Sequence, residues 1–235
     1  MPTTYDLRHY ALAGDTERVV ATLAWRGEGG KWVDPRTTVY TALKYASKKG
    51  KLGIVQAFLA WKGPAGEWVD ARVVGNDAVR YASRKGHLGI VQALLGWQGP
   101  EGEWVDPRPS LHREVRDAAR NGHLEVVEAL LGWRGPGGEW VDPRVMEDWA
   151  LRDAARYKHF TVVKALLGWR GPRGQCVDIE IARGEARGDA RGMQLWSLCD
   201  EEAAVRARWT PLRQEWIGAV MRGVWLRARR KVSNV

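Results

Sequence analysis

Apolar residues recur at helical spacing along most of this chain. Within 124–131 they follow one another at intervals of three and four residues, which places their side chains on one face of an α-helix. A shorter apolar face at 115–119 precedes it and stops at Gly122, because glycine readily takes the left-handed conformation that ends a helix. Equivalent stops are Gly14, Gly50 and Gly86. The pattern predicts pairs of short helices joined by tight turns.

A glycine- and proline-rich phrase follows each predicted second helix. It reads GPAGEWVDAR, GPEGEWVDPR and GPGGEWVDPR in three successive places. Glycine and proline favour a turn, and the tryptophan and valine after them favour extended backbone. Each helix pair is therefore expected to end in an extended loop, which we call the finger.

The pattern has a fixed period of 36 residues. Three sets of residues mark it: Trp25, Trp61, Trp97, Trp133 and Trp169; Trp32, Trp68, Trp104, Trp140 and Cys176; and Asp34, Asp70, Asp106, Asp142 and Asp178. A period of this length is typical of repeat architectures, in which neighbouring copies supply the core that a single copy lacks. The copies fall at 1–36, 37–72, 73–108, 109–144 and 145–180.

The helix-turn-helix part of each copy resembles the ankyrin repeat. The family signature AAxxGHxEVV is matched by AARNGHLEVV at 118–127. The period is longer than the family's, which is about 33 residues. The usual TPLH opening is replaced by TALK at 41–44, DAVR at 77–80, REVR at 113–116 and WALR at 149–152. The tryptophan-bearing finger is similar to ankyrin repeats that large DNA viruses of protists encode.

The resemblance implies an all-α solenoid of about five repeats. It also implies that the chain binds another protein, a host protein if the viral likeness holds, on its fingers and first helices. The two end copies depart from the pattern: Tyr10 replaces a recurrent alanine, and Lys158 replaces the turn glycine.

The repeat register ends after Asp178. Residues 181–192, which include the phrase ARGEARGDARG, are expected to form a linker, and 193–235 are expected to be helical over 193–208 and 211–230. Two hypotheses remain for the helical part. It either caps the last repeat or docks a partner, as the ubiquitin-ligase adaptor boxes of viral ankyrin proteins do. The phrase PLRQE at 211–215 does not reproduce the usual start of such a box.

Basic residues recur at two positions of the predicted first helices. They are Lys44 with Lys48, Arg80 with Arg84, Arg116 with Arg120, and Arg152 with Arg156. Residues four apart share a helical face, and stacked helices lie about 8–10 Å apart, so these side chains are expected to form a positive stripe. The stripe either binds an acidic protein segment or a phosphate backbone, or is a solvated face balanced by Asp77, Asp117 and Asp153.

The 14 tryptophans are the second unusual feature. Those at the ends of second helices recur in every copy, which favours packing between neighbours. Those in the fingers, Trp32, Trp68, Trp104 and Trp140, are candidates for either packing or partner binding, because finger tips are expected to be exposed. The aspartate and arginine of the VDPR phrase are expected to form turn hydrogen bonds and ion pairs between copies.

The composition is that of a folded soluble protein. A net charge of +9 favours acidic partners, nucleic acid included. No apolar run approaches the roughly 18 residues that cross a bilayer, and no secretory signal is recognised. Cys176 and Cys199 form neither a disulfide framework nor a CxxC metal motif. We expect a monomeric intracellular protein without membrane contact, in either cytoplasm or nucleus.

No catalytic, cofactor or metal site is predicted from the sequence. No phosphate-binding loop or nucleophilic triad is recognisable. His87, His123 and His159 occupy one position in successive copies, so they cannot meet around a metal, and hydrogen bonding at the helix turn accounts for them better. The leading hypothesis is a protein-interaction scaffold. Nucleic-acid binding through the stripe is the alternative, and an enzyme ranks third.

Overall fold

The computed structural model describes residues 1–74, 77–108, 113–185 and 194–207. Within these ranges the regular structure is helical, and extended backbone occurs only as isolated bridges in the loops. The all-α class predicted from the periodicity is confirmed for the described residues. No helix among them is long and apolar enough to cross a bilayer.

The helices come in antiparallel pairs. The pairs are α1 (Thr4–Ala13) with α2 (Thr16–Ala24), α3 (Val39–Lys49) with α4 (Leu52–Ala60), α5 (Asp77–Lys85) with α6 (Leu88–Leu95), α7 (Arg113–Arg120) with α8 (Leu124–Gly132), and α9 (Val145–Arg156) with α10 (Phe160–Gly168). We call the odd-numbered member of each pair the first helix. Short 3₁₀ turns, η1 (Glu28–Gly30), η2 (Pro35–Thr37) and η3 (Ala71–Val74), lie in the loops between pairs.

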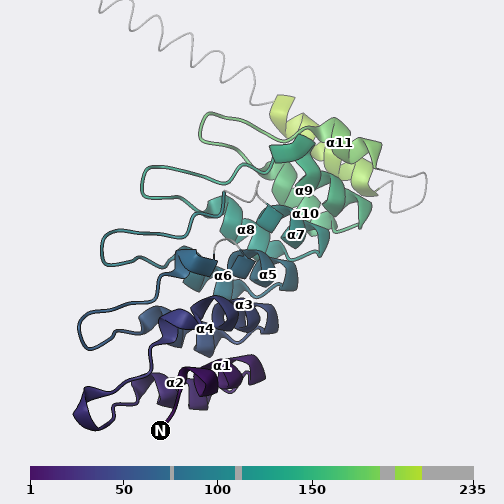
Figure 1. The fold of residues 1–235 in the computed structure, drawn as a ribbon. Helices are drawn as coiled ribbons and strands as arrows, with labels where there is room; N and C mark the ends of the chain where they lie inside the picture. Colours follow the sequence, from purple (N-terminus) through teal and green to yellow (C-terminus); the bar gives the residue numbers. More distant parts are fainter. Residues whose placement is uncertain (75–76, 109–112, 186–193, 208–235) are drawn as a thin grey trace, which may run out of the picture.

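The pairs stack in chain order, and each first helix packs against the next first helix (Figure 1). One continuous core runs through the stack and contains the fully buried side chains of Leu43, Phe58, Leu94 and Leu130. Where first helices meet, small residues allow close approach. The recurrent alanines Ala46, Ala82, Ala118 and Ala154 are all buried.

The turn inside each of the first four pairs contains a glycine, and at Gly86 two reasons favour it. Gly86 has a φ of 74°, a left-handed conformation that side chains disfavour. In addition, a Cβ placed on Gly86 would lie 2.6 Å from Nδ1 of His123 in the next pair. Nε2 of that histidine lies 3.2 Å from the carbonyl oxygen of Arg84, so it donates a hydrogen bond there. The predicted role of these histidines in helix-turn hydrogen bonding is confirmed for His123, and His159 repeats the contact with Arg120.

Lys158 takes the place of this glycine in the last pair and keeps the left-handed conformation, with a φ of 65°. The residue 36 positions after His159 is Leu195, which is buried. The close approach of a histidine ring that requires glycine at Gly86 therefore has no counterpart at Lys158. The left-handed conformation of Lys158 itself costs about 1 kcal/mol of folding free energy.

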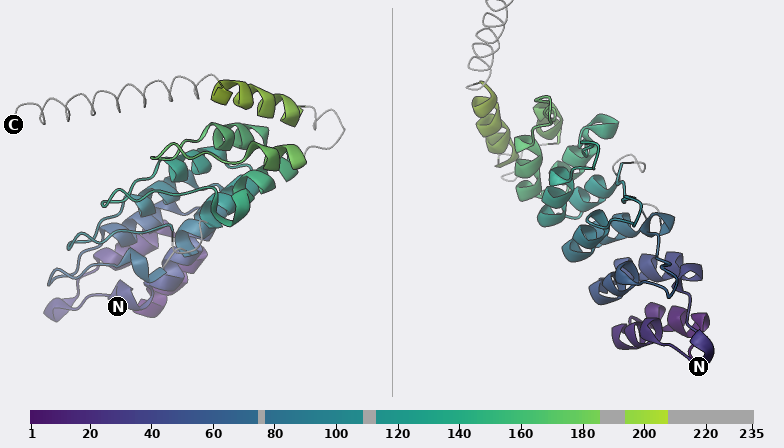
Figure 2. Two further views of the ribbon diagram at one scale, coloured as in Figure 1. Left: turned by 90° about the horizontal axis from the view of Figure 1, so that it is seen from above. Right: turned by 90° about the vertical axis from the view of Figure 1, so that its left-hand side faces the viewer.

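The fingers all project from the same side of the stack (Figures 1 and 2). The first four fingers double back through an antiparallel bridge, such as that between Gln98 and Trp104. Between the bridged residues the backbone N–H of Gly99 donates to the carbonyl of Glu103 at 2.8 Å, which closes the tip. The predicted turn followed by extended backbone is thus confirmed in these loops.

The segment after the last pair differs in part from the expected linker. Residues Ile179–Gly184 form the helix α11, because the Asp178 side chain accepts the N–H of Glu180 and Ile179 and Ala182 are buried. The linker predicted from residue 181 is therefore wrong for 181–184, and its part 186–192 lies outside the described residues.

Residues 194–207 are helical and lie beside the end of the stack (Figure 2). Leu195 and Cys199 are buried there, and burial raises the pKa of the Cys199 thiol. Arg206 donates to the carbonyls of Val177 at 2.9 Å and Leu167 at 3.0 Å. These contacts favour the cap hypothesis for 194–207. The predicted helix 211–230, on which the adaptor hypothesis depends, lies outside the described residues.

Candidate binding surface

The positive stripe consists of two rows with different surroundings. The row nearer the start of each first helix, here the inner row, is half-buried, and two of its members contact the next first helix. Its members are Lys44, Arg80, Arg116 and Arg152. Nζ of Lys44 lies 3.8 Å from the Asp77 carboxylate, and Nε of Arg116 lies 2.8 Å from that of Asp153. A hydrogen bond to the Tyr40 hydroxyl is the main cause that raises the pKa of Lys44. These inner-row cations thus help to join successive pairs.

The outer row, Lys48, Arg84, Arg120 and Arg156, is exposed. Two of its members are held by neighbours. Arg120 donates to the hydroxyl of Tyr157 at 2.9 Å, and Arg156 pairs with Glu185 at 3.1 Å. The hydrogen bond to Glu185 raises the pKa of Arg156. The side chains of the outer row are therefore held by neighbouring residues mainly at the C-terminal end of the stripe.

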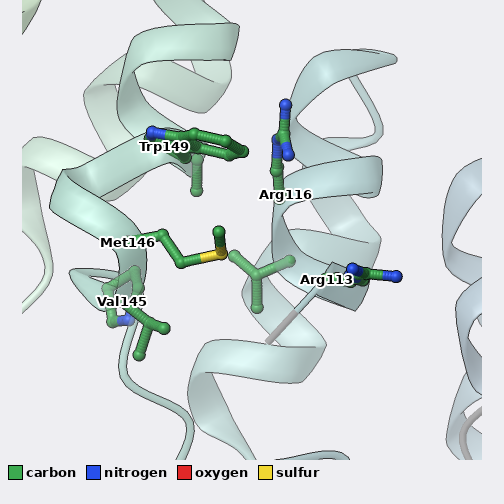
Figure 3. A pocket seen from close by; sticks show the side chains of 8 residues that line it. Arg113, Arg116, Val145, Met146 and Trp149 are labelled. Carbon is green, nitrogen blue, oxygen red and sulfur yellow. The ribbon is translucent and has the colours of Figure 1, made fainter. Parts of the chain in front are cut away.

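A cluster between α7 and α9 joins Arg116 of the inner row to residues outside the stripe (Figure 3). The guanidinium of Arg116 lies 3.9 Å from the ring centroid of Trp149, close enough for a cation–π contact. Met146 and Arg113 flank this pair, and both are exposed. Val115, Pro143, Val145 and Ala150 complete a small hollow. We call Arg113, Arg116, Met146 and Trp149 the α7–α9 cluster.

The backbone beneath this cluster is strained. Met146, Glu147 and Asp148 have φ values of 58°, 59° and 55°, although none is glycine. Such residues cost about 1–3 kcal/mol each and persist where the surroundings hold them. One such restraint is Asp148, which is buried and whose Oδ2 accepts the backbone N–H of Asp178 at 3.0 Å. The strain places Met146 at the rim of the hollow and Trp149 against Arg116.

Replacing Asp148 by asparagine should stabilise the protein by about 1 kcal/mol at neutral pH. Burial raises the pKa of Asp148, so this carboxyl favours the folded state when protonated and opposes it once ionised. Asparagine removes that charge, keeps an acceptor for Asp178 and tolerates the left-handed conformation. Urea denaturation should show the gain at pH 7, and it should shrink as the pH falls towards about 4. An equal gain at both pH values would contradict this account.

The tryptophans pair between copies. Each finger tryptophan packs on the tryptophan that ends the next second helix, and the ring centroids lie 5.2, 5.6, 5.4 and 5.5 Å apart in the pairs Trp32–Trp61, Trp68–Trp97, Trp104–Trp133 and Trp140–Trp169. The second-helix members of these pairs are at most 9% exposed, which confirms the predicted packing role. The finger members are half-buried beside the tip turn and face the neighbouring copy, so the expectation of exposed rings at the finger tips is wrong.

The finger surface keeps one feature that suits a partner. A hollow of about 320 Å³ lies between two fingers and is lined by Trp97, Trp104, Trp133 and Arg134. The arginine of the VDPR phrase also links copies, as Arg108 does with Glu139 at 3.9 Å. The predicted turn hydrogen bonds and ion pairs between copies are both present at this residue, whose N–H donates to Asp106 at 2.9 Å.

Sequence reasoning missed Trp149 and Met146, although a signal was available. At the position of Trp149 the preceding copies carry Tyr5, Thr41, Asp77 and Arg113, so this position differs in every copy, as positions of a binding surface usually do. Arg8 was missed as well, and it extends the inner row into α1.

No protein-family model and no curated protein matches this chain.

Proposed function

We propose that this chain is an ankyrin-type solenoid of about five repeats with long fingers and a helical C-terminal cap, and that it binds another protein. The binding face is formed by the fingers and first helices, with the α7–α9 cluster at its centre. If the likeness to viral repeats holds, the partner is a protein of the host cell.

The repeat assignment is supported by the way the helix pairs contact one another. The left-handed glycine, the histidine of the following pair and the tryptophan pairs recur with the period of the sequence. Each contact joins one copy to the next, which is how a solenoid builds its core.

The observation that carries the binding proposal is the break in repetition at the α7–α9 cluster. Contacts that recur in every copy serve packing, whereas the cluster occurs once and includes an exposed methionine beside Trp149 and Arg116. Tryptophan, methionine and arginine are the residue types that protein interfaces enrich. Three strained residues also hold the cluster in place, which is typical of functional sites.

Binding accounts for the cluster better than catalysis does. The enclosed part of its hollow is only about 10 Å³, whereas small-molecule sites occupy about 300–1,000 Å³. The hollow accepts the tip of a partner side chain, and Arg113 at its rim suits a partner carboxylate. The α7–α9 cluster is therefore proposed as a protein-binding site and not as a catalytic one.

Partner capture with matched variants tests the proposal. The full chain is immobilised and incubated with host-cell lysate, and the recovered protein is identified by mass spectrometry. Its affinity is then measured for Trp149→Thr, which introduces the residue that α3 carries at this position, and for Met146→Ser. The control is Trp196→Thr, since Trp196 is 47% exposed and lies on the segment 194–207.

We expect the Trp149 variant to bind at least about tenfold more weakly, as loss of an interface hot spot does. The Trp196 control should bind like the unchanged chain. Thermal unfolding shows whether each variant is folded at the assay temperature. If the partner binds both tryptophan variants equally, the α7–α9 cluster is not its binding site.

A further inference from the structure

The first-helix face changes character between its two halves. One position of the first helices, which recurs every 36 residues, carries an aromatic ring in the N-terminal half. The residues are His9 in α1, Tyr45 in α3 and Tyr81 in α5. The same position is aspartate in α7 and α9, as Asp117 and Asp153. Because consecutive first helices pack side by side, the three rings form a row on the N-terminal half. His9 is exposed and Tyr45 is 42% exposed, whereas Tyr81 is half-buried, so the first two rings of the row are open to solvent.

Cations accompany the rings. Each ring follows a basic residue in the sequence, namely Arg8, Lys44 and Arg80. Two inner-row members lie close to the last of these rings: Nζ of Lys44 lies 5.6 Å and the guanidinium of Arg80 lies 5.2 Å from the ring centroid of Tyr81. The C-terminal ends of two first helices carry further exposed cations. They are Lys48 and Lys49 in α3, and Arg84 and Lys85 in α5.

The kind of cation separates the two halves. Inner-row cations have an aspartate partner in both halves, as Arg80 has Asp77. The outer row differs, because α7 and α9 end with Arg120 and Arg156, which are held by Tyr157 and Glu185. The N-terminal half is rich in lysine, which protein interfaces disfavour but which binds phosphate well as a point charge. The helix dipole favours a basic residue at the end of a helix, but it does not account for a row of aromatic rings along the stack.

We propose that a single-stranded nucleic acid binds along the N-terminal half of the first-helix face, across α1, α3 and α5. Lys48, Arg84 and their exposed neighbours contact the phosphates, and bases pack on His9 and Tyr45. This pairing of an electropositive surface with aromatic platforms is how proteins hold single strands without reading their sequence. Asp117 repels the phosphate backbone and ends the site at α7. The site shares the first-helix face with the proposed protein-binding surface but does not include the α7–α9 cluster, so the Tyr45 and Trp149 variants test the two proposals separately.

Fluorescence anisotropy with a labelled oligouridylate of about 15 nucleotides tests the proposal. The full chain is titrated at several salt concentrations, and oligothymidylate, duplex DNA and polyglutamate serve as competitors. The cation variant is Lys48→Gln with Arg84→Gln. Its control is Lys31→Gln with Lys164→Gln. This variant also loses two exposed cations, one directly after η1 and one in α10, so its net charge equals that of the cation variant.

The ring is tested by Tyr45→Asp, which introduces the residue that α7 and α9 carry at this position, and by Tyr45→Leu. We expect Tyr45→Leu to weaken binding about tenfold and Tyr45→Asp to weaken it further. The cation variant should lower the slope of log affinity against log salt by about 1.4, since each single-strand phosphate contact contributes about 0.7. The control should keep the slope, and both single strands should compete better than the duplex.

Three results would overturn the proposal. They are an absence of binding at low salt, equal binding by the Tyr45 variants and the unchanged chain, and competition by polyglutamate as strong as that by the oligonucleotides. The last result would assign the face to an acidic protein segment. Circular dichroism of each variant establishes that a loss of binding is not a loss of folding.

Discussion

Replacing Trp133 by alanine should lower the free energy of unfolding by about 3–5 kcal/mol. Trp133 is only 9% exposed, and Trp104 from the preceding finger packs on it at 5.4 Å between ring centroids. The substitution therefore removes core volume and leaves the neighbouring ring without its partner. Urea denaturation followed by circular dichroism measures the loss.

Trp25→Ala is the matched control for this prediction. Trp25 also ends a second helix, but it belongs to the first pair, where no preceding finger covers it, and it is only half-buried. Its loss should cost less than half as much. In stacked repeats each copy contacts only its neighbours, so the Trp133 variant should also unfold less cooperatively. Equal losses for the two variants would show that the tryptophan pairs do not couple the copies.

Local patterns were sufficient to predict the helix pairs. The apolar spacing and the glycine stops act within about ten residues, and the left-handed conformation of Gly50 and Gly122 is what those stops require. Repetition then predicted that the tryptophans at the ends of second helices are packed. Both inferences succeed because the same local solution recurs in every copy.

The contacts between copies were harder to predict. Trp104 and Trp133 are 29 residues apart, and Arg116 and Asp153 are 37 apart, so neither pair shares a turn or a helix. A period states which residues are equivalent, but it does not say which of them touch across the repeat. Finger tryptophans were therefore expected at exposed tips, whereas apolar burial draws each ring onto the next copy.

The α7–α9 cluster escaped prediction for a different reason. Three successive left-handed residues at 146–148 have no signature in the sequence, because none of them is glycine or asparagine. Tertiary contacts hold them, including the hydrogen bond from Asp178 to Asp148. The position of Trp149 differs in every copy, and a search for positions that vary between copies would have found it.

Replacing Arg116 by methionine should destabilise the protein by about 2 kcal/mol. The substitution leaves the Asp153 carboxylate, whose side chain is 8% exposed, without its guanidinium partner at 2.8 Å. Methionine retains much of the packing against Trp149, so the loss mainly reports the unpaired charge. The estimate lies below that for a fully buried pair because the Arg116 side chain is 31% exposed and its charge is partly screened.

Arg80→Met tests the same row where the acid is accessible. Its partner Asp77 is 33% exposed and lies 3.2 Å away, so this loss should stay below about 1 kcal/mol. Adding Asp153→Asn to the Arg116 variant should restore most of its stability, and a double-mutant cycle gives the coupling. Equal effects at Arg80 and Arg116, or no restoration, would contradict the structural role of the inner row.

If the role holds, charge reversal at Arg116 changes folding as well as binding, so tests of partner contact belong on exposed positions such as Arg84 and Lys48.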